Sequence, residues 1–226
     1  MASLLKDQAY EILLDKIWNG EFQPNEVYSL TKIAQETGIS RTPLRDALQK
    51  LSDEKHVDIL QSRGFRLHQL NEIEIKQRYH LTIAVEGYSL IRLIEKYKKN
   101  TKDKHVTALE QCVYRMDHHP DQLTFKEMYQ LDNQFHNVVI DSLDDGFADY
   151  LSLREHGFVN IPELHIYARC LDMEKMFSFN RETLDAIKSL DGNRAYQNMI
   201  ANADYVYQVY MTEYTKENNA ADSYSF

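Results

Sequence analysis

The stretch from Ile39 to Leu51 constrains the fold of this chain more than any other. Ser40 suits the N-cap of a helix, because its hydroxyl can accept a hydrogen bond from a free amide of the first turn. Pro43 falls within that turn, where a missing N–H costs nothing. Apolar residues then recur at helical spacing and form one face, and the polar residues of the N-terminal end lie off that face. The apolar set is Leu44, Ala47, Leu48 and Leu51, and the polar set is Arg41, Thr42 and Arg45. Exposed donors at the start of a helix suit phosphates and base edges, although a surface helix with solvated arginines explains this stretch equally well.

The residues before this helix favour the DNA-binding interpretation. Residues 4–19 have helical spacing of apolar residues and stop at Gly20. Ser29 is placed to cap a second helix, which ends at Gly38, and the helix described above begins two residues later. A short helix, a tight turn containing glycine and a second helix make a helix-turn-helix.

The residues after this helix predict a β-hairpin. Residues 57–60 and 65–67 are short strand-like runs on either side of a turn that contains Gly64. Such a hairpin beside a helix-turn-helix is a wing, and we expect Arg63, Arg66 and His68 to decorate it.

The charge distribution separates two parts of the chain. The net charge of the chain is −9. Residues 1–70 carry 9 Lys and Arg against 10 Asp and Glu, a net charge of −1, so the rest of the chain has a net charge of −8. Residues 41–66 alone carry six basic and four acidic residues. The overall charge therefore does not exclude DNA binding, because a local basic face is what matters. The two cysteines make no disulfide framework, and no apolar run is long enough to span a membrane.

The second part of the chain predicts an all-helical antiparallel bundle. Proline, glycine and short polar breaks separate helical runs at residues 71–99, 103–116, 121–143, 147–171, 174–190 and 194–215. We expect Gly157 and Pro162 to kink or split the run at 147–171. The fold class is thus mainly α, with a winged helix-turn-helix at residues 1–70, a helical bundle at 71–216 and a flexible tail at 217–226.

Polar side chains interrupt the apolar faces of three bundle helices. Asp132 and His136 are four residues apart on one helix and share a face, and Asn180 and Asn202 lie on the apolar faces of two others. Each needs a partner, because an unsatisfied buried polar group costs about 1–3 kcal/mol. The partners are one another, water or a bound ligand.

The N-terminal residues resemble the winged helix of the GntR superfamily of bacterial transcription regulators. The matching segments are Leu30-Thr31-Lys32-Ile33-Ala34 and Gly38-Ile39-Ser40-Arg41-Thr42-Pro43-Leu44-Arg45-Asp46-Ala47-Leu48, together with the wing residue Gly64. The resemblance implies base and backbone contacts from the start of the second helix, the start of the recognition helix and the wing tip. The residues implied are Thr31, Lys32, Ser40, Arg41, Thr42, Arg45, Arg63 and Gly64. Lys55-His56 stands where the family usually has a glycine.

Residues 73–212 resemble the FCD ligand-binding domain of the FadR-like branch of that family. Many members hold a divalent metal with one Asp and three His, and Asp132 and His136 match the first two ligands. Asn180 and Asn202 replace the two remaining histidines, and a carboxamide is a poor ligand for zinc or nickel. Thr82 replaces an arginine that often holds an effector carboxylate, with Glu86 following as usual. The resemblance implies an effector site built from Thr82, Asp132, His136, Asn180 and Asn202, with a divalent metal disfavoured.

These observations predict a cytoplasmic, homodimeric transcription regulator that binds double-stranded operator DNA and a small-molecule effector. Repression released by the effector is the commoner behaviour in the family. Two alternatives remain at this stage. One is a helical metal-dependent enzyme built on Asp132 and His136, and the other is a DNA-binding dimer that takes no effector. We expect no enzymatic activity and no membrane partner.

Overall fold

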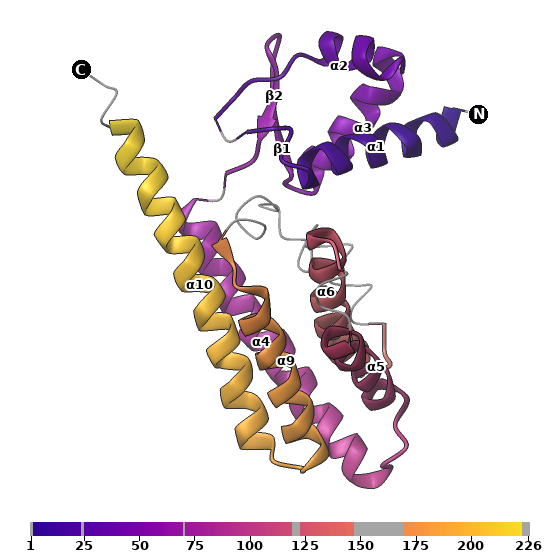
Figure 1. Cartoon of the computed structure of the whole chain (residues 1–226), viewed down its shortest axis with the longest axis vertical. Helices are drawn as coiled ribbons and strands as arrows, with labels where there is room; N and C mark the ends of the chain where they lie inside the picture. Colours follow the sequence, from indigo (N-terminus) through magenta and orange to yellow (C-terminus); the bar gives the residue numbers. More distant parts are fainter. Residues whose placement is uncertain (1, 24, 70, 119–122, 147–169, 223–226) are drawn as a thin grey trace. The chain divides into compact units, whose positions relative to one another are not determined.

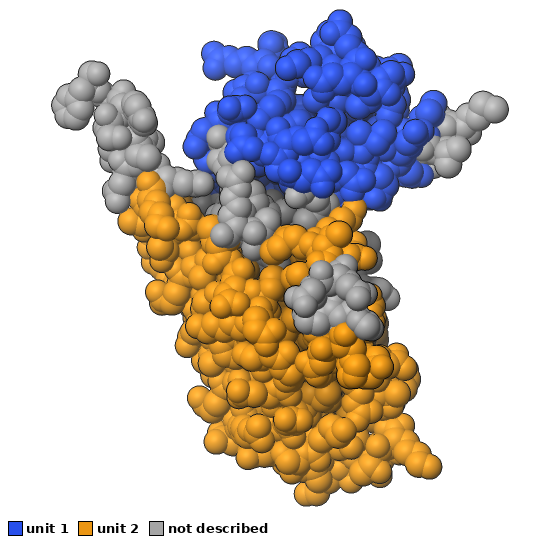
Figure 2. All heavy atoms as spheres, in the orientation of Figure 1, with its two compact units in different colours: residues 1–70, 160–169 blue, residues 71–159, 170–226 orange. Residues whose placement is uncertain are grey.

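The computed structural model describes residues 2–23, 25–69, 71–118, 123–146 and 170–222. The chain divides into two compact units, one formed by the N-terminal segment to residue 70 and one formed by the helices that follow (Figures 1 and 2). No helix of the described ranges has the length and apolar character needed to cross a membrane. The architecture is mainly helical with one two-stranded hairpin, as the sequence predicts.

Three helices form the body of the first unit. Helix α1 spans Ala2–Trp18, α2 spans Leu30–Thr37 and α3 spans Arg41–Asp53. Helix α3 packs on both α1 and α2, so its apolar face is the centre of the unit (Figure 1). All four apolar residues predicted for that face are buried: Leu44, Ala47, Leu48 and Leu51.

The N-cap residues of α2 and α3 are the two serines that the sequence predicts, but their side chains do not form the expected capping hydrogen bonds. Ser29 and Ser40 occupy the N-cap positions with extended backbone, yet neither side chain makes a capping hydrogen bond. The expectation that the Ser40 hydroxyl caps α3 is therefore wrong. Gly38 ends α2 at φ 70°, a left-handed conformation that glycine adopts at little cost.

The hairpin joins β1 (Val57–Leu60) to β2 (Gly64–Leu67) in antiparallel register, with Val57 opposite Leu67 and Leu60 opposite Gly64. Tyr28, just before α2, extends this pairing by a bridge to Phe65. The Tyr28 amide donates to the Phe65 carbonyl at 2.7 Å, and the Phe65 amide donates to the Tyr28 carbonyl at 3.0 Å. The wing is thus tied to the helix-turn-helix through its backbone.

Two residues expected to decorate the wing are instead engaged by Asp58. The Arg66 Nε donates to Asp58 Oδ2 at 3.1 Å, and His68 Nδ1 lies 2.7 Å from Asp58 Oδ1. His68 is buried. Only Arg63 of the three stands at the turn with an exposed side chain. Lys55, at the position where a glycine is usual, adopts φ 62°, which explains the preference for glycine there.

The second unit contains five described helices. They are α4 (Glu72–Lys99), α5 (Lys104–His118), α6 (Phe125–Asp141), α9 (Met173–Lys188) and α10 (Gly192–Asp222). The run expected at 147–171 lies outside the described residues, apart from its last two positions. Helix α6 begins later than the expected residue 121, because Thr124 and Glu127 form a capping box. Helix α10 continues past the expected end near Thr215, since no glycine or proline interrupts it.

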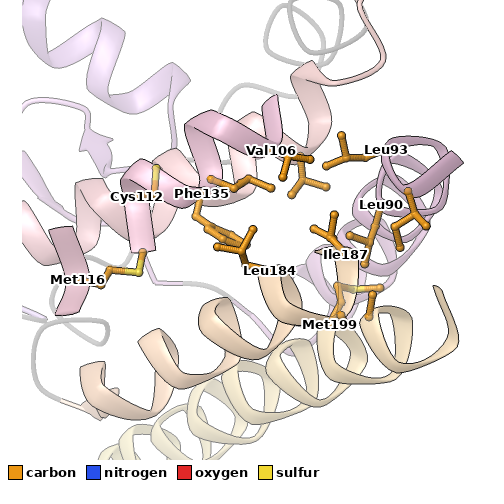
Figure 3. Packing of buried hydrophobic residues seen from close by; sticks show 14 of the residues in the cluster. Leu90, Leu93, Val106, Cys112, Met116, Phe135, Leu184, Ile187 and Met199 are labelled. Carbon is orange, nitrogen blue, oxygen red and sulfur yellow. The ribbon is translucent and has the colours of Figure 1, made fainter. Parts of the chain in front are cut away.

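A continuous apolar core holds these helices together (Figure 3). Helix α10 packs along α4 and α9, while α5 packs against α6 and α9. Leu90 and Leu93 of α4 belong to one cluster of buried residues with side chains from every other described helix of the unit. Figure 3 labels seven further members: Val106, Cys112, Met116, Phe135, Leu184, Ile187 and Met199. This core leaves room for a polar group only where several helices face one another.

Candidate DNA-binding face and buried polar cavity

The exposed donors of the first unit gather at the N-terminal end of α3, at the start of α2 and on the wing. Arg41, Arg45 and Arg63 are exposed, and within the described residues none of their side chains makes an ion pair or a hydrogen bond. The remaining predicted residues also lie on the surface or at the turn: Thr31, Lys32, Ser40, Thr42 and Gly64. The Ser40 hydroxyl, which does not cap its own helix, is open to an external acceptor. Cationic and hydroxyl donors of this kind bind phosphates and base edges.

Arg66 provides a contrast with these arginines. Its guanidinium is held by Asp58 at 3.1 Å, so part of its hydrogen-bonding capacity is already used. Lys32 is 77% exposed, and its ion pair with Glu36 is long, at 3.9 Å, so its ammonium group remains accessible to a phosphate.

In the second unit, the polar side chains predicted to interrupt the apolar faces come together. Asn180 of α9 donates its Nδ2 to Asp132 Oδ1 of α6 at 2.7 Å, and both residues are buried. His136, one turn after Asp132, places its Nε2 3.8 Å from the same carboxylate oxygen. Helical spacing predicted that these side chains face the bundle interior, and contact with one another was one of the three kinds of partner left open.

Glu86 of α4 completes the cluster and was absent from the predicted site. Its Oε2 lies 2.7 Å from His136 Nδ1, and only 8% of the residue is exposed. The sequence carried a signal for it, because Tyr79, Ile83, Glu86 and Leu90 follow one another at helical spacing. Thr82, the predicted effector contact one turn earlier, does not line the cavity described below.

Two opposing effects set the pKa of His136. Burial alone would lower it, but the carboxylates of Glu86 and Asp132 favour the charged ring and raise the pKa to about 9. The imidazole is therefore protonated at neutral pH, and both of its nitrogens act as donors.

A small cavity lies beside this cluster. Its lining residues are Glu86, Leu90, Phe135, His136, Val139, Asn180, Thr183, Met199 and Asn202. Its volume is about 10 Å³, roughly the space needed for one water molecule or a group of that size. Asn202 is 5% exposed, and its Oδ1 has no hydrogen-bond partner among the described residues. The cavity therefore contains a buried hydrogen-bond acceptor that has no donor among the described residues.

The residues present do not fit a zinc or nickel ion. One imidazole, one carboxylate and two carboxamides make a donor set unlike those that these metals prefer. The Asn180 amide directs its nitrogen rather than its oxygen at Asp132. Within the described ranges, no group of three or more His, Cys, Asp or Glu side chains is arranged to hold a metal.

The raised pKa of His136 makes stability depend on pH. Its stabilising charge is fully present below pH 6.5, the ordinary value of an unfolded histidine, and is lost as pH rises through about 9. We expect the free energy of unfolding to fall over this range by up to about 3 kcal/mol relative to a His136→Gln variant. Urea denaturation of both proteins at a series of pH values, with a chelator present, measures the difference. Parallel pH profiles would show that folding does not shift the pKa of His136, and a stability that rises with pH relative to the variant would show that folding lowers it.

Comparison with known proteins finds similar sequences among transcription regulators. Residues 5–67 match the family of bacterial regulatory proteins named gntR. The chain is 23% identical over 216 residues to the HTH-type transcriptional regulator YdhC of Bacillus subtilis (strain 168), covering 93% of this chain and 94% of that protein. It is 28% identical over 115 residues to the Nta operon transcriptional regulator of Aminobacter aminovorans, covering 51% and 52% of the two chains.

Solved structures share the fold. A GntR transcriptional regulator from Rhodococcus sp. RHA1 superposes with a TM-score of 0.71 at 17% identity, over 92% of this chain and 97% of that one. E. coli McbR/YncC superposes with a TM-score of 0.68 at 14% identity, over 93% and 98%. At these identities the likeness concerns the fold alone.

Proposed function

Since the chain is a DNA-binding transcriptional regulator of the GntR family, we propose that it is a homodimeric, effector-controlled repressor. Its family and relatives are regulators and not enzymes. The proposal joins two sites: the donor face of the first unit, which contacts operator DNA, and the polar cavity of the second, which takes the effector. A cytoplasmic location follows from the proposed target.

The observation that carries the DNA-binding part is the set of unpaired, exposed arginines at α3 and the wing. Arg41 and Arg45 are four residues apart and therefore share one face of α3. A two-fold dimer would present two such helices to two half-sites of a pseudo-palindromic operator. The wing, held by Tyr28, would carry Arg63 toward the same duplex.

The observation that supports effector control is the unsatisfied acceptor in the bundle cavity. A molecule that satisfies Asn202 would stabilise one arrangement of the bundle helices over others. In the proposed mechanism this shifts the population of dimer conformations, and the spacing of the two winged helices changes with it. A dimer that takes no effector would instead leave DNA affinity unchanged by any small molecule.

Arg45→Ala tests the DNA-binding part. We expect affinity for a duplex selected from a random-sequence library to fall by about 1–3 kcal/mol, with relaxed preference at one base pair, if the guanidinium reads a base edge. Fluorescence anisotropy on selected and scrambled duplexes measures both quantities. Arg66→Ala is the matched control, since it removes the same charge from a guanidinium already held by Asp58. Equal losses for the two variants would remove Arg45 from the specific contacts.

A further inference from the structure

The chemistry of the cavity restricts what it can bind. Two carboxylates, those of Glu86 and Asp132, stand beside one imidazole, that of His136. If the ring is protonated the cluster carries −1, and if it is neutral the cluster carries −2. No lysine or arginine is among the lining residues in the described part of the chain. The cluster is therefore negative in either protonation state.

The unoccupied hydrogen-bonding positions around the cavity include acceptors from three side chains, together with the amide N–H donors of Asn202 and the Nε2–H of His136. Asn202 Oδ1 is buried without a partner among the described residues. Asn180 uses its Nδ2 on Asp132, and Glu86 uses its Oε2 on His136. This leaves Asn180 Oδ1 and Glu86 Oε1 as the second oxygens of side chains that line the cavity. Thr183 already accepts a hydrogen bond from Asn198 at 2.6 Å.

We propose that this cavity binds the protonated amino group of a small organic amine. An ammonium group has three N–H donors and no acceptor, which complements the set of oxygens. It is about the size of a water molecule, which matches the volume of about 10 Å³. Leu90, Phe135, Val139 and Met199 form the apolar part of the lining, and their side chains must shift to admit a short apolar body attached to that group.

The same chemistry argues against a carboxylate ligand. A third carboxylate beside Glu86 and Asp132 would be desolvated next to like charges, without a lysine or arginine from the described lining to compensate it. The presence of Thr82 in place of the arginine that often holds an effector carboxylate in the family points the same way. The amine proposal rests on the proposed function, because it takes this cavity to be the effector site.

Thermal unfolding of the full-length protein with propylammonium chloride or sodium propionate at matched ionic strength tests the proposal. We expect propylammonium to raise the Tm in a saturable manner and propionate to leave it unchanged. Ammonium chloride shows whether the amino group alone suffices, and sodium chloride controls for salt.

Two variants of one residue give opposite expectations. Asn202→Leu removes the acceptor and should raise the half-saturating propylammonium concentration about tenfold or more, as expected for a lost hydrogen bond to a charged group. Asn202→Asp adds a charged acceptor and should lower it. Gln197→Leu, exposed on the same helix, is the matched control and should leave it unchanged.

Three outcomes would overturn the proposal: saturation by propionate, saturation by magnesium or zinc chloride instead of the amine, or no saturable response, which would indicate a cavity that holds water only. DNA affinity, measured in parallel, separates this inference from the proposed function. If propylammonium binds but leaves DNA affinity unchanged, the amine site stands and effector control fails. If propionate binds and alters DNA affinity, effector control stands and the amine site fails.

Discussion

Replacing Gly64 by Ala is expected to detach the wing and abolish specific DNA binding. A Cβ at this position would lie 2.0 Å from the Tyr28 carbonyl oxygen and 2.9 Å from its carbonyl carbon. Both are backbone atoms, so no side-chain rotation can relieve the overlap. The residue also has φ 124°, which an L-amino acid with a side chain rarely adopts.

The energetic cost follows from what must move. Shifting Tyr28 breaks the two backbone hydrogen bonds between Tyr28 and Phe65, each worth about 0.5–1.5 kcal/mol. It also disturbs the packing of Phe22, Tyr28 and Phe65, whose ring centroids lie 4.6–5.8 Å apart. With about 1–3 kcal/mol of backbone strain added, we expect the free energy of unfolding of the first unit to fall by about 3 kcal/mol or more. Urea denaturation and anisotropy on the selected duplex measure the two effects.

Gly38→Ala is the matched control for this variant. Gly38 also has a positive φ, 70°, but a Cβ there would meet no atom within 4 Å. Only the left-handed strain remains, about 1–2 kcal/mol. Similar losses for Gly38→Ala and Gly64→Ala would show that conformation, rather than the approach of Tyr28, makes glycine necessary in the wing.

The winged helix was predictable because its signals are local. Gly38, Pro43 and the apolar spacing of α3 each act within a few residues, and the strands of the wing lie within one residue of the expected positions. The predictions that failed concern the hydrogen-bond partners of individual polar side chains. The Ser40 hydroxyl leaves its cap unformed, and His68 turns inward to Asp58 across the hairpin. Such pairings depend on tertiary packing, which spacing along the chain does not specify.

The polar cluster of the bundle was predictable in part for the same reason. Helical spacing placed Asp132, His136, Asn180 and Asn202 on inward faces, but it could not show that Asn180 donates to Asp132. Glu86 was overlooked although it shares the apolar stripe of α4, since its partner His136 lies 50 residues away. The start of α6 was misplaced because Asp121 and Thr124 are both suitable caps, and only Thr124 has a glutamate three residues later.

Replacing both Asn180 and Asn202 by His is expected to convert the cavity into a zinc site. Asn180 already contacts Asp132, and Asn202 lines the same cavity as His136. Two imidazoles at these positions would join one carboxylate and one imidazole, a ligand set that zinc prefers. Glu86 would keep its contact with His136 Nδ1 and direct Nε2 inward, as carboxylates beside zinc-bound histidines do. We expect the double variant to bind zinc about 100-fold or more tightly than the wild-type chain.

Competition with a chromophoric chelator, followed by elemental analysis of the dialysed protein, measures this gain. Asn198→His on the same helix is the control, because that position donates to Phe179 and Thr183 and does not line the cavity. Stoichiometric zinc in the wild-type chain would contradict the conclusion that its donor set is unsuitable. Bound zinc would also cancel the −2 charge of Glu86 and Asp132 beside a neutral His136 and would attract an anionic ligand. The zinc-loaded double variant should therefore respond to propionate rather than propylammonium, which would trace ligand preference to the two asparagines.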